Sequence, residues 1–149
     1  MDNGLIGLLG IARKAGKAEV GEESVSAAAK AHKARVLLLA SDAGDRTRRH
    51  AEALSGEGGC PLLPVPLAKA ELGGAVGRGS CAILALTDIG LANAAVKKLE
   101  AVDPEIRQRL DHKAEKTLRR RRETRQRERA AQSARRKPWA PPPQEKTPQ

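Results

Sequence analysis

The hydrophobic residues of the first hundred positions follow two spacings, one typical of helices and one typical of buried strands. Over residues 5–15, leucine and alanine recur every three or four positions, which predicts an amphipathic helix. The runs RVLLLA at 35–40 and SCAILAL at 80–86 are continuously apolar. A strand with one solvated face would alternate polar and apolar residues, so these two runs predict strands that are covered on both faces.

Shorter segments complete an alternation of helices and strands. Further strands are predicted at 18–20 and at 61–66, where the prolines favour an edge position. Further helices are predicted over 21–34, over a segment from Asp42 or Asp45 to about 54, over 67–77, and after an N-cap at Thr87 or Asp88. This order predicts an α/β fold: a three-layer α-β-α sandwich with a small mixed, mostly parallel four-stranded sheet.

The chain changes in kind after this region, which predicts one domain over residues 1–103 and a basic C-terminal tail over 104–149. Asp103, Pro104 and Glu105 form a typical helix start. We expect the tail to be partly helical to about residue 136 and then Pro-rich and disordered. Its basic part is either a solvated helix or a disordered segment that orders on RNA. A remainder of this length is too short for a second hydrophobic core.

Charge is concentrated in that tail. The net charge of the chain is +10, and residues 1–103 carry 13 Lys/Arg against 12 Asp/Glu, so nearly all the excess lies beyond them. A basic block of this kind attracts polyanions: nucleic acid first, an anionic membrane surface second. The chain has one Trp and no Tyr or Phe, which argues against recognition of single strands by aromatic stacking.

The sequence offers little for catalysis. Its glycine clusters match neither a phosphate-binding loop nor a dinucleotide fingerprint, and its three histidines accompany no recognisable nucleophile motif. Cys60 and Cys81 are best interpreted as buried thiols, with a disulfide or a metal site as the alternative. We expect no enzyme, no cofactor and no metal. Neither a signal peptide nor an apolar run long enough to span a bilayer is visible, which predicts a cytoplasmic protein without a membrane partner.

The segment from Gly21 to Ser24 is the most informative candidate for binding. A glycine lets a ligand approach the backbone closely, and the following helix N-terminus offers N–H groups to phosphate or base acceptors. The carboxylates of Glu22 and Glu23 can accept hydrogen bonds from guanine or cytosine amino groups. The alternative is a plain glycine turn with acidic residues that favour the helix dipole.

Four segments in order resemble the ribosomal L-seven-Ae / L-thirty-e family, and specifically its short bacterial YlxQ-like branch. They are LLGIARKAGKAEVGEESV, KARVLLLASDAGDRT, VPLAKAELGGAVGRGSCAILALTD and GLANAAVKKL. The resemblance covers about the first two-thirds of the chain. It implies a three-layer α-β-α fold, binding of RNA kink-turns and related internal loops, occurrence in ribosomes and other ribonucleoproteins, and no catalysis.

The resemblance assigns RNA contacts to particular residues. The family's Gly-x-Asn-Glu-type loop falls on Gly21, Glu22, Glu23 and Ser24. Glu23 stands where the family has Asn, and an ionised Glu accepts hydrogen bonds but donates none. The second contact region of the family, before the last strand, falls on Val76, Gly77 and Arg78. Val76 would pack on a flipped-out base and Arg78 would reach phosphate, although core packing is an equal alternative for Val76.

Basic residues complete the candidate site. The family resemblance favours Lys14 and Lys17 as phosphate contacts, with Lys33 as a possible addition, against the alternative of solvated surface charges. The tail run Arg119, Arg120, Arg121 and Arg122 is expected to bind phosphate without sequence choice.

The leading hypothesis is therefore a monomeric, non-catalytic binder of structured RNA, ribosome-associated or similar to a ribosomal protein, with RNA and ribosomal proteins as partners. Two alternatives stay open. One is an RNA-recognition subunit that acts in trans for an RNA-modifying enzyme. The other is a protein-interaction module of the same fold.

Overall fold

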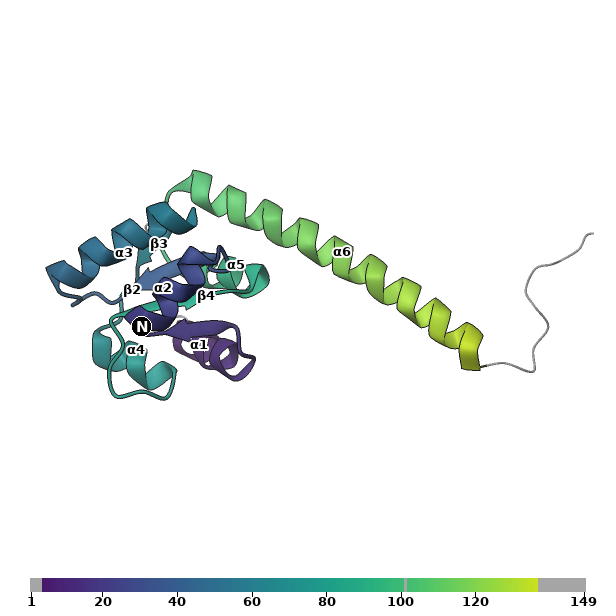
Figure 1. Cartoon of the computed structure of the whole chain (residues 1–149), viewed down its shortest axis with the longest axis horizontal. Coiled ribbons are helices and arrows are strands. Elements are labelled where there is room, and N and C mark those ends of the chain that lie inside the picture. The colour runs from purple at the N-terminus through teal and green to yellow at the C-terminus, as the bar shows by residue number, and fades with distance from the viewer. Residues whose placement is uncertain (1–3, 101, 137–149) are drawn as a thin grey trace, which may run out of the picture. The chain divides into compact units, whose positions relative to one another are not determined.

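The computed structural model describes residues 4–100 and 102–136 and contains a four-stranded sheet with helices on both sides of it (Figure 1). The strands are β1 (Ala18–Val20), β2 (Val36–Leu39), β3 (Leu62–Pro64) and β4 (Ile83–Leu86). The helices are α1 (Leu5–Lys14), α2 (Glu22–Lys30), α3 (Asp45–Gly58), α4 (Lys69–Ala75), α5 (Ile89–Lys97) and α6 (Pro104–Arg136). The predicted α/β class and the predicted order of elements are confirmed.

The strand order is β1-β4-β2-β3. β2 and β3 are parallel, whereas β4 is antiparallel to both of its neighbours, β1 and β2. Three strands therefore run in one direction, but the reversed strand lies inside the sheet and makes two of the three pairings antiparallel. The sheet is mixed, as expected. It is not mostly parallel when its strand pairings are counted, because only the β2–β3 pairing is parallel. The predicted edge position of the Pro-bounded strand is confirmed.

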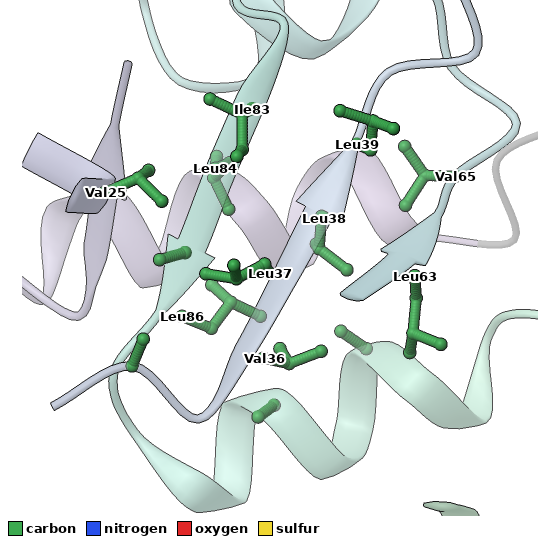
Figure 2. Packing of buried hydrophobic residues seen from close by; sticks show 14 of the residues in the cluster. Val25, Val36, Leu37, Leu38, Leu39, Leu63, Val65, Ile83, Leu84 and Leu86 are labelled. Carbon is green, nitrogen blue, oxygen red and sulfur yellow. The ribbon is translucent and has the colours of Figure 1, made fainter. Parts of the chain in front are cut away.

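The core lies in the two central strands. Every residue of β2 and β4 is buried, because helices cover both faces of the sheet. α2 packs against α3, and α1 packs against α4 and α5. Figure 2 shows leucine, isoleucine and valine side chains of β2, β3 and β4 filling the space around the sheet, with Val25 of α2 beside them. Close packing of small aliphatic residues replaces the aromatic residues that the chain lacks.

Both ends of α3 differ from the sequence prediction. α3 begins at Asp45 after Gly44, and the carboxylate of Asp42 instead accepts a hydrogen bond of 2.7 Å from the backbone N–H of Lys69 at the start of α4. α3 also continues past residue 54 to Gly58. A Cβ at Gly58 would lie 2.9 Å from the carbonyl oxygen of Ala29 in α2, so this glycine is required by close helix packing and does not break the helix.

The first compact unit of the chain ends at Ala114, beyond the residue 103 expected from the sequence. Leu110 and Ala114, in the first turns of α6, are each only 3 % exposed. The amide of Asn93 in α5 donates to Asp111 over 3.2 Å. Within this unit, α6 therefore begins as a packed helix.

The second unit starts at Glu115, and its described part is the remainder of α6. α6 continues through Arg136, and the Pro-rich segment lies outside the described residues. Among the residues that the structure describes, no helix is both long and apolar enough to cross a membrane.

Candidate functional site

Gly21 forms a sharp turn between β1 and α2. Its backbone has φ 93° and ψ 158°, a conformation that is essentially restricted to glycine. Its N–H donates to the carbonyl of Ile83 (3.2 Å), and its carbonyl accepts from the N–H of Val25 (3.0 Å), so the turn is fixed to β4 on one side and to α2 on the other. No heavy atom of the described residues lies within 4 Å of where a Cβ would be. The turn is therefore rigid and open to a ligand on this side.

The first turn of α2 is acidic and exposed. Glu22 and Glu23 both lie on the surface, where the helix dipole favours negative charge, and Ser24 is half-buried. A carboxylate oxygen of Glu22 lies 3.2 Å from Nδ1 of His50 in α3, and both side chains are about half exposed. Sequence reasoning gave His50 no role, because no local pattern joins two residues on separate helices.

The turn after α4 is held by backbone hydrogen bonds and by Arg13. Gly77 has φ 73°, and the N–H of Arg78 donates to the carbonyl of Gly73 over 2.7 Å. The guanidinium of Arg13 in α1 donates to the carbonyl of Val76. The Val76 side chain is 1 % exposed, so Val76 packs in the core. The exposed part of this turn consists of Gly77, Arg78, Gly79 and Ser80.

Cys81 connects the two turns. Its thiol is buried and donates to the carbonyl of Ile83 (3.1 Å). Burial raises the pKa of the Cys81 thiol, whereas the backbone N–H of Gly21 and the positive charge of Arg78 lower it. The Gly21 N–H and the Cys81 thiol donate to the same carbonyl, that of Ile83, and Cys81 follows Arg78 by three residues, so the two segments that sequence reasoning singled out are neighbours. The prediction that Cys60 and Cys81 are buried thiols is confirmed, since both are free and buried.

The predicted lysine contacts lie away from Gly21. The carbonyl of Lys17 accepts from the N–H of Thr87, at the opposite end of β1 from Gly21. A strand rises by about 3.3 Å per residue, so the two Cα atoms are about 13 Å apart. Lys14 ends α1, three residues before Lys17 in the chain, and Lys33 follows the C-terminal end of α2. Lys17 and Lys33 therefore lie at the ends of β1 and α2 that are away from Gly21, and all three lysines are exposed.

Arg119, Arg120, Arg121 and Arg122 belong to the second unit and are exposed on α6. Successive helix residues are separated by about 100° around the axis, so four consecutive arginines distribute their charge around the helix. This arrangement suits attraction to a polyanion and offers no shaped site.

Comparisons with known proteins support the fold. No family model matches the chain, and no curated protein has a significantly similar sequence. Among solved structures, a protein of unknown function from Bacillus halodurans is similar with a TM-score of 0.59 and 26 % identity, over 63 % of this chain and 94 % of that one. The 15.5 kDa RNA binding protein of Giardia lamblia is similar with a TM-score of 0.52 and 17 % identity, over 63 % of this chain and 80 % of that one. The chain therefore shares a fold with an RNA-binding protein.

Proposed function

We propose that this protein binds structured RNA at the surface formed by the Gly21 turn, the first turn of α2 and the exposed residues Gly77 and Arg78. The observation that carries the proposal is that the open Gly21 turn and Cys81, three residues after the exposed Arg78, are hydrogen-bonded to the same carbonyl of Ile83. The shared fold with an RNA-binding protein supports it. The proposed role is recognition without catalysis.

The contacts follow from the chemistry of the groups present. Helix N-terminal N–H groups of α2 can donate to phosphate or base acceptors, and the exposed carboxylate of Glu23 can accept from base amino groups. Arg78 can bind a phosphate with two parallel hydrogen bonds. Glu23 cannot reproduce the donor of the family's Asn, so the preferred internal loop must supply donors at that point.

The RNA class that fits best is a kink-turn or a related internal loop. The ordered segments shared with the L-seven-Ae / L-thirty-e family support this class, and with it a monomeric, ribosome-associated role in the cytoplasm of a bacterium. Lys17 would then contact a phosphate about 13 Å from Gly21. Lys14 and Lys33 would contact further phosphates. The arginines of α6 would add affinity without sequence choice.

A gel-shift titration of the full chain tests the proposal, with a kink-turn RNA and a straight duplex of equal length at moderate salt with magnesium. We expect the kink-turn to bind at least tenfold more tightly, which corresponds to about 1.4 kcal/mol. Arg78→Gln should remove most of this preference. Arg46→Gln, which removes the same charge from an exposed position of α3, should preserve it.

Equal affinity for both RNAs contradicts the proposed site, because binding would then rest on charge alone. Equal effects of Arg78→Gln and Arg46→Gln contradict the assignment of Arg78.

A further inference from the structure

A small cavity with a cationic lining lies at the other end of the sheet from the Gly21 turn. It has a volume of about 180 Å³ and is enclosed by the end of α2, the start of β2, the segment that joins α3 to β3, and the first turns of α6. Its lining includes four basic side chains: His32, Arg35, Arg109 and Lys113. All of them belong to the first compact unit.

The position of this cavity follows from the strand register. The N–H of Arg35 donates to the carbonyl of Leu86, whereas Gly21 bonds to Ile83 at the opposite end of β4. The Arg35 end and the Gly21 end of β4 are separated by the four residue pairs that join β2 to β4. The cavity is therefore a distinct site that the proposed RNA surface does not include.

The charges around the cavity are not balanced by its own lining. Among the residues that line it, none carries a carboxylate. Arg109 has one acidic partner, Glu105, at the long distance of 3.8 Å, and both side chains are mostly exposed, so this ion pair is weak. Three permanently charged side chains, all of them exposed, border this small space, and an anion bound among them would be attracted to each.

His32 is the second observation that points to a ligand. It follows the C-cap of α2 with φ 57°, a left-handed position that glycine usually occupies at the end of a helix. The N–H groups of His32 and Lys33 donate to the carbonyls of Ala29 and Ala28 (3.0 and 2.9 Å), which is the hydrogen-bond pattern that terminates a helix in this way. A side chain makes this left-handed conformation less favourable than it is for glycine, so holding a histidine there has a cost. The cost is understandable if its ring is used, and the ring lines the cavity with Nδ1 3.4 Å from the carbonyl of Gly58.

Three backbone N–H groups of the lining are already hydrogen-bonded within the fold. The N–H groups of Gly59 and Cys60 both donate to the carbonyl of Ser55, and that of Arg35 donates to Leu86. These three N–H groups are therefore engaged within the fold, whereas the guanidinium, ammonium and imidazole groups of the lining are the ones we assign to a ligand. Arginine forks match the oxygen geometry of phosphate, and lysine adds a point charge.

We propose that this cavity binds a single phosphoryl group, either the phosphate of a small phosphorylated molecule or a phosphate of RNA. The volume admits one such group and excludes a folded polymer. Arg35 and Arg109 would contact its oxygens, and Lys113 and His32 would close the site around it.

The test is an NMR titration of the full chain with inorganic phosphate at constant ionic strength, with chloride as the balancing salt. We expect saturable shifts of the backbone signals of Arg35, Gly59 and Lys113. Arg109→Gln should weaken the apparent affinity about tenfold, the loss that accompanies one charge-assisted hydrogen bond. The matched variant Arg46→Gln, on the exposed face of α3, should leave the affinity unchanged, and both variants should keep the thermal unfolding midpoint of the parent.

Shifts that do not saturate, or that Arg109→Gln and Arg46→Gln affect equally, overturn the proposal. A second arm separates the two sources of phosphate. If the double variant Arg35→Gln/Arg109→Gln weakens RNA binding more than the charge-matched Arg46→Gln/Arg48→Gln, the ligand is an RNA phosphate. If the two double variants bind RNA equally while phosphate binding is lost only in the first, the ligand is a small phosphorylated molecule. Neither arm requires the kink-turn proposal to hold.

Discussion

The guanidinium of Arg13 donates a hydrogen bond to the carbonyl of Val76, 63 residues further along the chain. This bond fixes the end of α1 to the turn after α4, and Gly77, with φ 73°, lies against the same guanidinium: a Cβ there would be 3.2 Å from its nitrogen. Arg13 is therefore a positioning residue for the surface that carries Arg78. It contacts the backbone of the turn, so its role is to hold that surface in place.

Replacing Arg13 with Gln should loosen the turn and weaken RNA binding although Arg13 need not touch the RNA. A hydrogen bond to a charged group contributes about 1.5–3 kcal/mol, so we expect the unfolding free energy to fall by an amount in that range. Hydrogen exchange of the Gly77 and Arg78 amides should accelerate. The control is Lys14→Gln, which removes a neighbouring surface charge and should leave the exchange rates of both amides unchanged. Equal acceleration of exchange in the two variants would contradict the role given to Arg13.

Gly21→Ala should destabilise the protein because of backbone conformation and not because of crowding. The φ of 93° and ψ of 158° are nearly exclusive to glycine, so the substitution should cost about 1–3 kcal/mol in chemical denaturation. Gly56→Ala is the matched control: Gly56 is exposed inside α3 with no described heavy atom within 4 Å of a new Cβ. Alanine there should stabilise by about 0.5–1 kcal/mol. A neutral or stabilising effect of Gly21→Ala would show that this turn does not require glycine.

Leu110→Ala should destabilise the first compact unit, whereas Leu118→Ala should not. Leu110 is 3 % exposed and Leu118 is 47 % exposed on the same helix. Truncation of a buried leucine costs about 2–5 kcal/mol, and truncation of an exposed one costs little. Thermal or denaturant unfolding measures both. A negligible effect of Leu110→Ala would restore the earlier boundary at residue 103.

Neutralising the arginine run of α6 should weaken RNA binding to all sequences alike. In the variant with Gln at positions 119–122, the slope of log K against log salt should become shallower by up to about three units, since each phosphate contact contributes about 0.7–0.9. The preference for a kink-turn over a duplex should persist. A loss of preference with an unchanged slope would mean that the tail reads structure and that the assignment of recognition to the globular unit is wrong.

Asp111 should make the docking of α6 on α5 sensitive to acid. The hydrogen bond from Asn93, followed by that from Lys97, lowers the pKa of the Asp111 carboxyl from its ordinary value of 3.8. Because the folded-state pKa is the lower one, the contribution to stability is complete above about pH 4 and is lost as the pH falls through the folded-state value. The side chain is about half exposed, so the effect is small. Asp111→Asn should flatten the fall of the unfolding midpoint below pH 4, and an unchanged acid profile would contradict this assignment.

The sequence by itself determined the order and type of the elements, because these depend on contacts between residues close in the chain. Helical periodicity over 5–15 and the apolar runs around β2 and β4 produced the α/β class, and local capping was predictable as well. The carboxylate of Asp88 accepts from the N–H of Leu91 (3.0 Å), and that of Asp103 accepts from the N–H of Glu105 (2.9 Å). Burial of Cys60 and Cys81 followed from their apolar neighbours.

Only the tertiary structure decided which of the candidate residues share a surface. Strand order is a non-local property, and the insertion of the reversed strand β4 between β1 and β2 brings Gly21 to the Ile83 end of that strand and Lys17 to its Leu86 end. This register separates the predicted lysines from the predicted turn and places Arg35 beside the cavity lined by Arg109, residues that no local pattern relates. Periodicity reports which residues face the core, but the pairing of strands, which brings distant segments together, decides what meets at the surface.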